Sequence, residues 1–132
     1  MSKSPVVHFE MPYEDAKRVS KFYQDAFGWG MNNAGANMGN YIVAITADTD
    51  EKMMVKTPGT INGGFYQKSK STNPYPSFVI SVDNLEEAMK AVEKAGGKIT
   101  GKPQEIPGVG MWAVFIDSEG NKVSLLQAKK YE

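Results

Sequence analysis

Residues 6–28 read VVHFEMPYEDAKRVSKFYQDAFG and predict a strand followed by a helix. Residues 6–11 are rich in β-branched and aromatic side chains and lie between two prolines, which is typical of a short strand. Apolar residues then recur every three or four positions from Ala16 to Phe27, as on one face of an amphipathic helix. Asp15 is suited to accept hydrogen bonds from the first turn, and Gly28 to supply the left-handed residue that ends the helix.

Residues 77–97, SFVISVDNLEEAMKAVEKAGG, repeat this plan in the second half of the chain. Asn84 is the expected cap, with Glu87 three positions later as in a capping box. Two glycines at 96 and 97 are expected to end the helix. The same spacing separates His8 from Asp15 and Ser77 from Asn84, so the sequence predicts two copies of one supersecondary unit.

Three more strands are expected in each half. Their predicted ranges are 29–32, 41–47 and 63–67 in the first half, and 98–106, 111–116 and 122–127 in the second. Residues 33–40 and 49–60 are expected to be loops, and Asp117–Asn121 a tight hairpin turn. The predicted fold class is α+β: two βαβββ modules, about 5–68 and 74–128, in a single domain spanning residues 1–132. They would form a curved mixed sheet with the helices on its outer face.

Alternation along the strands divides their side chains between two faces. In residues 6–11 one face is wholly apolar, and the other carries His8 and Glu10. The strands at 77–82 and 122–127 likewise have one apolar face, and Ser77, Ser81 and Ser124 fall on the other. With helices on the apolar face, the polar face of a curved sheet would become a cup into which these side chains converge.

Composition limits the classes of function. The 132 residues carry 15 basic and 15 acidic side chains, so no net charge favours nucleic acid or an anionic membrane. Cysteine is absent, which excludes disulfides, thiolate nucleophiles and cysteine zinc sites. No apolar stretch reaches the roughly 18 residues of a membrane span, and the first residues contain no apolar signal core. We therefore expect a cytoplasmic protein with no nucleic-acid or membrane partner.

The runs 6–29, 77–98 and 115–127, together with INGGFYQ at 61–67, resemble the vicinal oxygen chelate superfamily, which contains glyoxalases, bleomycin-resistance proteins and dioxygenases. The resemblance covers nearly the whole chain and is closest to small glyoxalase-like proteins. It implies the same cup-shaped α+β fold. It does not select one activity, because a single fold supports many functions.

The resemblance also implies a divalent metal held by one residue on each of three strands: a His, a second His and a Glu. His8 matches the first position, but Ser77 and Ser124 occupy the other two. An alternative carboxylate position falls at Gly63-Gly64, which has no side-chain ligand. Neutral hydroxyls are poor ligands for such metals. We therefore expect no tightly bound metal or other cofactor, and only weak binding of a divalent ion.

His8 is the sole histidine, and Glu10 shares its face two residues along the strand. These two residues are the candidate catalytic pair. The candidate ligand-binding residues are the polar and aromatic side chains expected in the cup, namely His8, Trp29, Tyr41, Phe65, Ser77, Trp112 and Ser124. The alternative is that His8 is a structural, partly buried histidine and that most of the aromatic residues are core or dimer contacts.

Three functions fit this pattern. The first is a metal-free protein that binds a small planar or amphipathic molecule in the cup. The second is a lyase or isomerase, similar to lactoylglutathione lyase, that uses His8 and Glu10 with a weakly held divalent metal. The third is an interaction module in which the sheet pairs with a second copy, since homodimers are common for this architecture.

Overall fold

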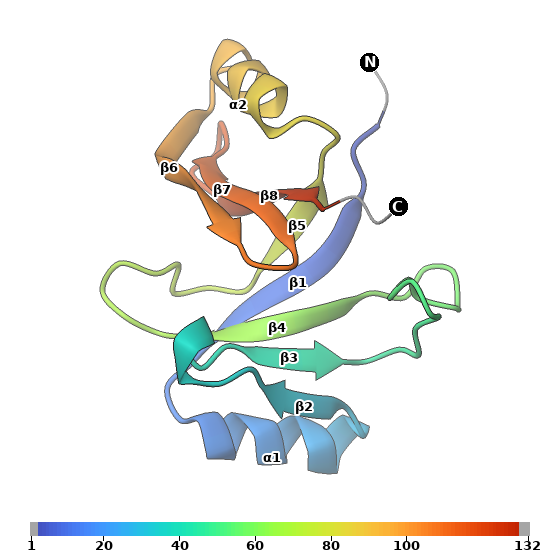
Figure 1. The fold of residues 1–132 in the computed structure, drawn as a ribbon. Coiled ribbons are helices and arrows are strands. Elements are labelled where there is room, and N and C mark those ends of the chain that lie inside the picture. Colours follow the sequence, from blue (N-terminus) through green and yellow to red (C-terminus); the bar gives the residue numbers. More distant parts are fainter. Residues whose placement is uncertain (1–2, 130–132) are drawn as a thin grey trace. The chain divides into compact units, whose positions relative to one another are not determined.

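A computed structural model describes residues 3–129 (Figure 1). The chain divides into two compact units, which are described separately below. The β1–β4 unit comprises residues 8–76, and the β5–β8 unit comprises the described parts of residues 1–7 and 77–132. Each unit contains one helix and a mixed set of strands, and the predicted α+β class with two βαβββ modules is confirmed.

The β1–β4 unit follows the predicted order. Strand β1 (Val6–Tyr13) leads to helix α1 (Ala16–Phe27), and β2 (Gly30–Asn33), β3 (Ile42–Ile45) and β4 (Asn62–Gln67) follow. The spatial order of the strands is β2-β3-β4-β1. Strands β2, β3 and β4 are antiparallel neighbours, whereas β1 and β4 run parallel, with Glu10 opposite Gly64. A short 3-10 turn, Ala36–Met38, lies between β2 and β3.

Helix α1 covers one face of these strands. The backbone N–H of Arg18 donates to Oδ1 of Asp15 at 3.0 Å, and Gly28 has φ of 70°, so both predicted ends are confirmed. The core of this unit combines five buried side chains with partly buried residues of α1 and β1: Tyr13, Met31, Ile42, Ala44 and Phe65, with Phe9, Met11, Ala16, Val19 and Tyr23 among the latter. The opposite face of the strands therefore carries the alternate residues.

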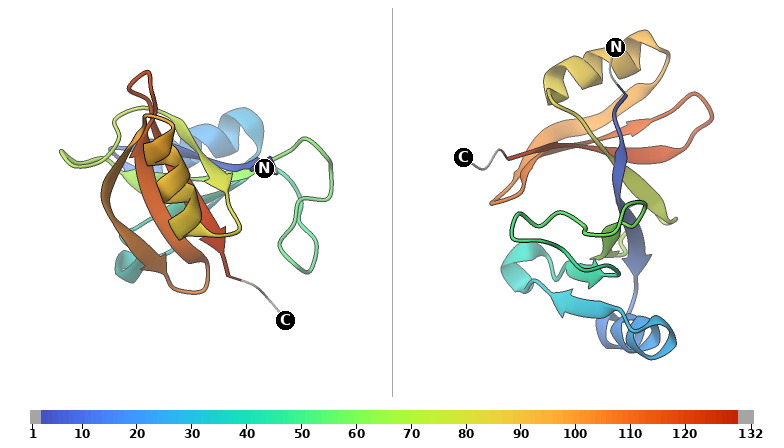
Figure 2. Two further views of the ribbon diagram at one scale, coloured as in Figure 1. Left: turned by 90° about the horizontal axis from the view of Figure 1, so that it is seen from above. Right: turned by 90° about the vertical axis from the view of Figure 1, so that its right-hand side faces the viewer.

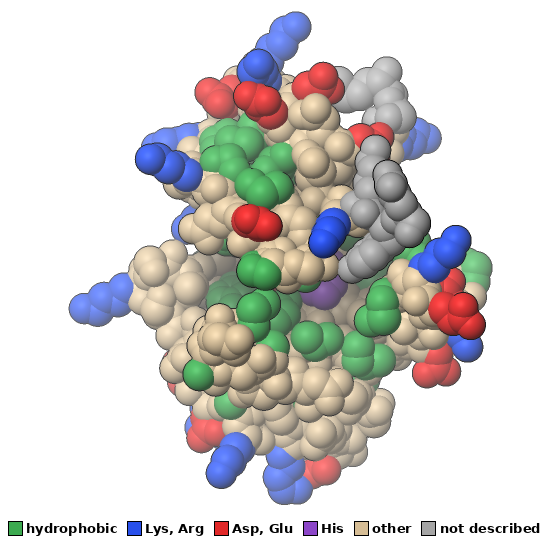
Figure 3. Space-filling model, viewed as in Figure 1, with side chains coloured by type: hydrophobic (Ala, Val, Ile, Leu, Met, Phe, Trp, Pro, Cys, Tyr) green, Lys and Arg blue, Asp and Glu red, His purple; other side chains and the backbone are tan. Residues whose placement is uncertain are grey.

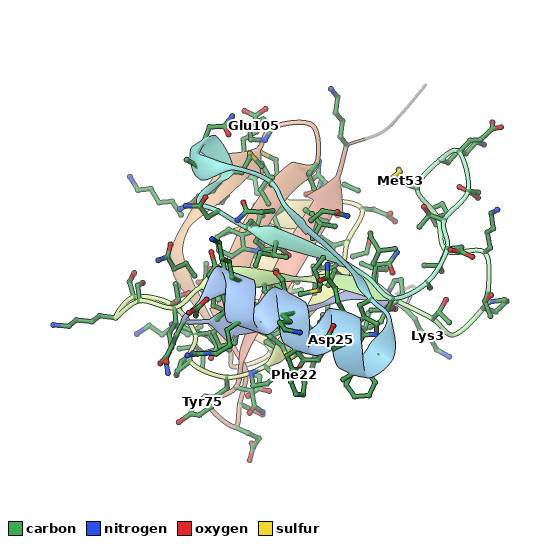
Figure 4. The ribbon with its side chains drawn as sticks, turned by 90° about the horizontal axis from the view of Figure 1, so that it is seen from below. Lys3, Phe22, Asp25, Met53, Tyr75 and Glu105 are labelled. Atoms are coloured by element: carbon green, nitrogen blue, oxygen red, sulfur yellow. The ribbon has the colours of Figure 1, made fainter. Side chains whose placement is uncertain are left out.

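Two aromatic side chains of the predicted apolar stripe stay at the surface. Phe22 is 57% exposed and Phe27 is 64% exposed, and their ring centroids lie 6.5 Å apart. Phe22 projects from α1 in the view from below (Figure 4). Phe22 is at the margin of the stripe, since Val19 and Tyr23 are the positions that contact the core.

The β5–β8 unit repeats the arrangement. It contains β5 (Ser77–Ser81), α2 (Leu85–Lys94), β6 (Lys98–Ile106), β7 (Gly110–Ile116) and β8 (Lys122–Ala128). The spatial order is β5-β8-β7-β6, with β5 and β8 parallel and the other pairs antiparallel. Helix α2 lies across one face of these strands (Figure 2). Its cap is confirmed, because the backbone N–H of Glu87 donates to Oδ1 of Asn84 at 2.9 Å.

The core beneath α2 includes Ile80, Val123 and Leu125, which alternation placed on the apolar faces of β5 and β8. Leu85, Ala113, Phe115, Val123 and Leu125 are buried, and Ile80 packs against them. The left-handed residue after this helix is Gly96, with φ of 100°. Gly97 has a different role, because a Cβ there would lie 2.7 Å from Cγ1 of Val92 and 2.9 Å from the Ile116 carbonyl oxygen.

The expected boundary at Pro12 is wrong. Strand β1 continues through Pro12 to Tyr13, and Pro12 pairs with Tyr66 of β4. The strand is extended by long-range contacts: Tyr13 is buried in the core, and its hydroxyl donates to the Asn40 carbonyl at 2.7 Å. Such tertiary contacts outweigh the local tendency of proline to end a strand.

No helix within residues 3–129 is both long enough and apolar enough to cross a bilayer.

Candidate functional site

The candidate site lies on the face of the β1–β4 unit that faces away from α1. Phe9 and Met11 belong to the core beneath the helix, so alternation places His8 and Glu10 on the other face. On β4, Phe65 is in the core and Gly64 and Tyr66 are on the face of His8. On β3, Val43 pairs with Gly64 and shares this face. We call this surface the open face of the β1–β4 unit.

His8 and Tyr41 are in direct contact in this unit. Nε2 of the imidazole and the phenol oxygen are 3.2 Å apart, which is a hydrogen bond between residues 33 positions apart in the chain. Burial lowers the pKa of His8 and raises the pKa of Tyr41. Both shifts favour an uncharged imidazole beside a protonated phenol at neutral pH. The His8 side chain is the purple group in the space-filling view (Figure 3).

Glu10 is the one carboxyl group that the β1–β4 strands carry. Burial raises its pKa from 4.5 to about 7, because a desolvated carboxylate is disfavoured relative to the neutral acid. The group therefore exchanges a proton near neutral pH. A carboxyl with this property can donate a hydrogen bond, accept one or act as a general acid or base.

Tyr66 adds a second phenol to the open face. Its hydroxyl donates to the carbonyl of Asn73, which ties β4 to the segment that follows it. Burial and then the charge of Glu10 raise the pKa of Tyr66 to about 12. Glu10 also raises the pKa of Tyr41. Both phenols therefore keep their protons and are available as neutral hydrogen-bonding groups.

Positive charge is absent from these four strands. Their sequences, VVHFEMPY, GMNN, IVAI and NGGFYQ, contain no Lys or Arg. Since His8 is held uncharged, the open face combines one titratable carboxyl with neutral hydroxyl, imidazole and apolar groups. Such a surface offers no cation to pair with an anionic ligand.

Two of the predicted ligand-binding aromatics, one buried and one partly buried, pack with α1 and do not belong to this face. Phe65 is 1% exposed and packs between β4 and α1, at 5.2 Å from the ring of Tyr23. The Trp29 indole stacks on Tyr23 with a centroid distance of 4.6 Å. Both are held by aromatic contacts with the helix, so we leave them out of the proposed site.

Three predicted site residues belong to the β5–β8 unit. The hydroxyl of Ser77 donates to the Lys122 carbonyl at 2.6 Å, which joins the starts of β5 and β8. Ser124 is 6% exposed and pairs with Val79 on the face away from α2. Trp112 is half-buried on β7 and pairs with Leu126 on that same face. The structure therefore supports the predicted face for each of them within their own unit.

The donor set does not fit the divalent metal that the resemblance implies. Among residues 3–129, no three His, Cys, Asp or Glu side chains gather. Ser77 uses its hydroxyl as a donor to a carbonyl, and Gly64 supplies no side chain. The remaining imidazole already shares its Nε2 with a phenol.

Gly64 and Tyr66 are not among the predicted ligand-binding residues. With Phe65 expected in the cup, alternation along β4 would put Tyr66 on the opposite face, whereas the structure places Phe65 in the core and Tyr66 on the face of His8. The sequence pointed to Gly64 only as an implied ligand position without a side chain, and a glycine in a strand has several explanations. Its role depends on the position of Tyr41, which is 23 residues earlier in the chain.

Comparison with known proteins gives a consistent family. The family model described as Glyoxalase/Bleomycin resistance protein/Dioxygenase superfamily matches residues 6–125. A glyoxylase-like domain-containing protein of Didymella fabae is 32% identical over 116 residues, covering 85% of this chain and 84% of the relative.

Solved structures share the fold at low identity. Methylmalonyl-CoA epimerase from Mycobacterium tuberculosis is similar with a TM-score of 0.68 at 12% identity, covering 98% of this chain and 93% of that one. A hypothetical protein from Bacillus halodurans C-125 has a TM-score of 0.68 at 13% identity, covering 99% of each chain. These likenesses show the fold.

Proposed function

We propose, from the premise that this chain belongs to the glyoxalase, bleomycin-resistance and dioxygenase superfamily, that it binds a small molecule on the open face of the β1–β4 unit without a tightly bound metal. The observation that carries the proposal is the gathering of His8, Glu10 and Tyr41 on a strand face that the core does not use. Pockets that combine apolar surface with a few convergent polar groups are typical ligand sites.

The chemistry of this face favours a planar or amphipathic ligand that is not an anion. Tyr41, Tyr66 and Val43 supply apolar and aromatic surface, while Glu10 and His8 supply hydrogen-bonding groups. An anionic ligand would meet the Glu10 carboxylate without a strand-borne Lys or Arg to offset the repulsion. A ligand with hydroxyl or N–H donors would satisfy the same carboxylate.

A thermal-shift screen of metal-stripped protein against small aromatic alcohols, amides, amines and carboxylates tests this proposal. A ligand at 100 times its Kd stabilises the folded state by about 2.7 kcal/mol, which is a measurable rise in Tm. We expect donor-bearing members to raise Tm and carboxylates to have no effect. Glu10→Gln should weaken binding. Glu14→Gln should not, because the Glu14 side chain is 67% exposed beside Arg18. No response from any compound, or equal weakening by both variants, would contradict the proposal.

The second candidate is a lyase or isomerase that uses Glu10 and His8 with a weakly held divalent metal. The raised pKa of Glu10, about 7, favours it, because a base poised near neutral pH suits proton abstraction next to a carbonyl. One of the structural neighbours is described as a methylmalonyl-CoA epimerase. Here the proposed step is removal of the α-proton by the Glu10 carboxylate, which leaves the electron pair in an enolate. A proton then returns to that carbon in an epimerisation, or to the neighbouring carbon in a glyoxalase-type isomerisation.

Exchange with solvent deuterium tests this candidate. The protein would be incubated in D2O with methylmalonyl-CoA, or with the hemithioacetal of methylglyoxal and glutathione, with and without added Zn²⁺, Ni²⁺ or Mn²⁺. Deuterium in the α-position that disappears in Glu10→Gln and persists in Glu14→Gln would support catalysis. Absence of exchange under every metal condition would leave the binding proposal alone.

A homodimer is the third proposal. Beside the sheet pairing expected from the sequence, the exposed rings of Phe22 and Phe27 on α1 offer an apolar surface for it. Aromatic side chains are enriched in the buried centres of protein interfaces. Sedimentation equilibrium of the unmodified protein and of Phe22→Ser/Phe27→Ser tests it. We expect a dimer that the double substitution weakens. A monomer at micromolar concentration would contradict it.

A further inference from the structure

The phenol of Tyr41 lies directly on the backbone of Gly64. A Cβ built at Gly64 would be 1.8 Å from the Tyr41 hydroxyl oxygen and 2.1 Å from Cζ. Both distances are far below any contact that a real side chain makes, so the phenol occupies the space that a side chain at position 64 would fill. The φ of Gly64 is not in the left-handed region, so its backbone conformation does not require glycine. The requirement is the space above it.

The same phenol reaches His8 from that position. The Tyr41 hydroxyl oxygen is 3.2 Å from Nε2 of His8. His8 lies on β1, the strand that pairs with β4. The family resemblance implies a metal ligand at position 8 and an alternative carboxylate position near Gly63-Gly64. Gly64 has no side chain at the alternative carboxylate position. The Tyr41 phenol occupies that space and contacts His8.

We propose that Gly64 is a positioning residue. Because it has no side chain, the Tyr41 phenol can lie across β4 and form a hydrogen bond with Nε2 of His8. His8, at the implied metal-ligand position, is therefore one half of a hydrogen-bonded pair. The inference rests on the proposed function in that it concerns the same site. Its test needs no ligand, so its outcome is separate from that of the binding screen.

The hydrogen bond favours one position for the proton of the His8 ring. A phenol hydroxyl is a stronger donor than acceptor, so Nε2 is expected to accept from Tyr41 and the neutral imidazole to carry its proton on Nδ1. One tautomer is therefore stabilised relative to the other. A hydrogen bond of ordinary net strength shifts such an equilibrium by about fivefold. Without Tyr41, the ratio should move toward that of a solvated imidazole.

The sole histidine makes this equilibrium directly measurable. A tag-free, ¹⁵N-labelled protein gives one set of ring nitrogen signals at neutral pH, and the urea-unfolded chain gives the reference ratio of tautomers. We expect the folded protein to differ from that reference by about fivefold. Tyr41→Phe should return the ratio toward the reference. Gly64→Ala should do the same although Tyr41 is unchanged, and Tyr41→Phe/Gly64→Ala should match Tyr41→Phe alone.

Ile42→Val is the matched control. Ile42 is 1% exposed in the core of the same unit, so its shortening lowers stability from the opposite face of β3. It should leave the tautomer ratio of His8 unchanged. If Gly64→Ala does not fold, Tyr41→Phe still decides whether the phenol holds the ring. An unchanged ratio in Tyr41→Phe, or a change of equal size in Ile42→Val, would overturn the proposal.

A zinc titration followed on the same signals supplies a second readout. Releasing Nε2 in Tyr41→Phe should lower the zinc concentration needed to shift the His8 signals by about fivefold. Zinc binding that is as tight in the unmodified protein as in Tyr41→Phe would mean that Tyr41 does not compete for the nitrogen. That result would overturn the proposal.

Discussion

The Tyr41 phenol and the His8 imidazole form a 3.2 Å hydrogen bond across β4, although 33 residues separate them in the chain. The contact depends on the pairing of β1 with β4 and of β3 with β4, which brings both residues to one face. It places two neutral polar groups beside Glu10, the one carboxyl on these strands.

Glu10→Gln should change how the free energy of unfolding depends on pH. The pKa of Glu10 rises from 4.5 to about 7 on folding, so between these values the folded chain binds more protons than the unfolded chain. Stability therefore falls as pH rises from 4.5 through 7. Glu10→Gln removes this fall and should make the protein about 3 kcal/mol more stable than the unmodified chain at pH 8.

Urea unfolding at a series of pH values from 4 to 8 measures this difference. Glu14→Gln is the control, because its exposed carboxylate makes only surface ion pairs, with Arg18 and Lys68. A pH profile of Glu10→Gln that runs parallel to that of the unmodified protein would show that the Glu10 carboxyl is not desolvated in the folded state.

Tyr66→Phe should loosen the segment after β4. The Tyr66 hydroxyl donates to the Asn73 carbonyl, and its loss should cost about 1 kcal/mol of stability. Hydrogen exchange should accelerate in residues 68–76 and stay unchanged in α1. Tyr75→Phe provides the comparison, since Tyr75 is 71% exposed. Equal exchange in the two variants would contradict the assigned role of Tyr66.

Removal of the helix caps should destabilise the two helices independently. Asp15 accepts from the Arg18 N–H and Asn84 from the Glu87 N–H, each near 3 Å. Alanine at either position should cost about 1 kcal/mol. The caps belong to different units and share no partner, so the double variant should lose the sum. Thermal and urea unfolding measure the three values, and a double loss well below the sum would contradict independence.

Most of the fold was predictable because its signals are local. Periodic apolar residues and the caps Asp15 and Asn84 defined both helices, and alternation assigned Phe9 and Leu125 to the core faces. The continuation of β1 through Pro12 was not predictable, because it depends on Tyr13 being buried by residues far along the chain.

The candidate site was predictable only in part. Alternation placed His8 and Glu10 on one face, which the structure supports. It could not distinguish ligand-facing aromatics from core aromatics, and Phe65 and Trp29 pack with Tyr23 beneath α1. Nor could it reveal that Gly64 leaves room for Tyr41, since that relationship is a contact between strands rather than a pattern along one strand.

The most direct test of the account is ligand binding on metal-stripped protein, observed at the single imidazole. Titration with hits from the thermal-shift screen, in the presence of EDTA, should move the ring signals of His8 saturably, and Glu10→Gln should weaken the effect. Ligands that bind only after a divalent metal is added, or that saturate without any change at His8, would contradict a metal-free site on this face.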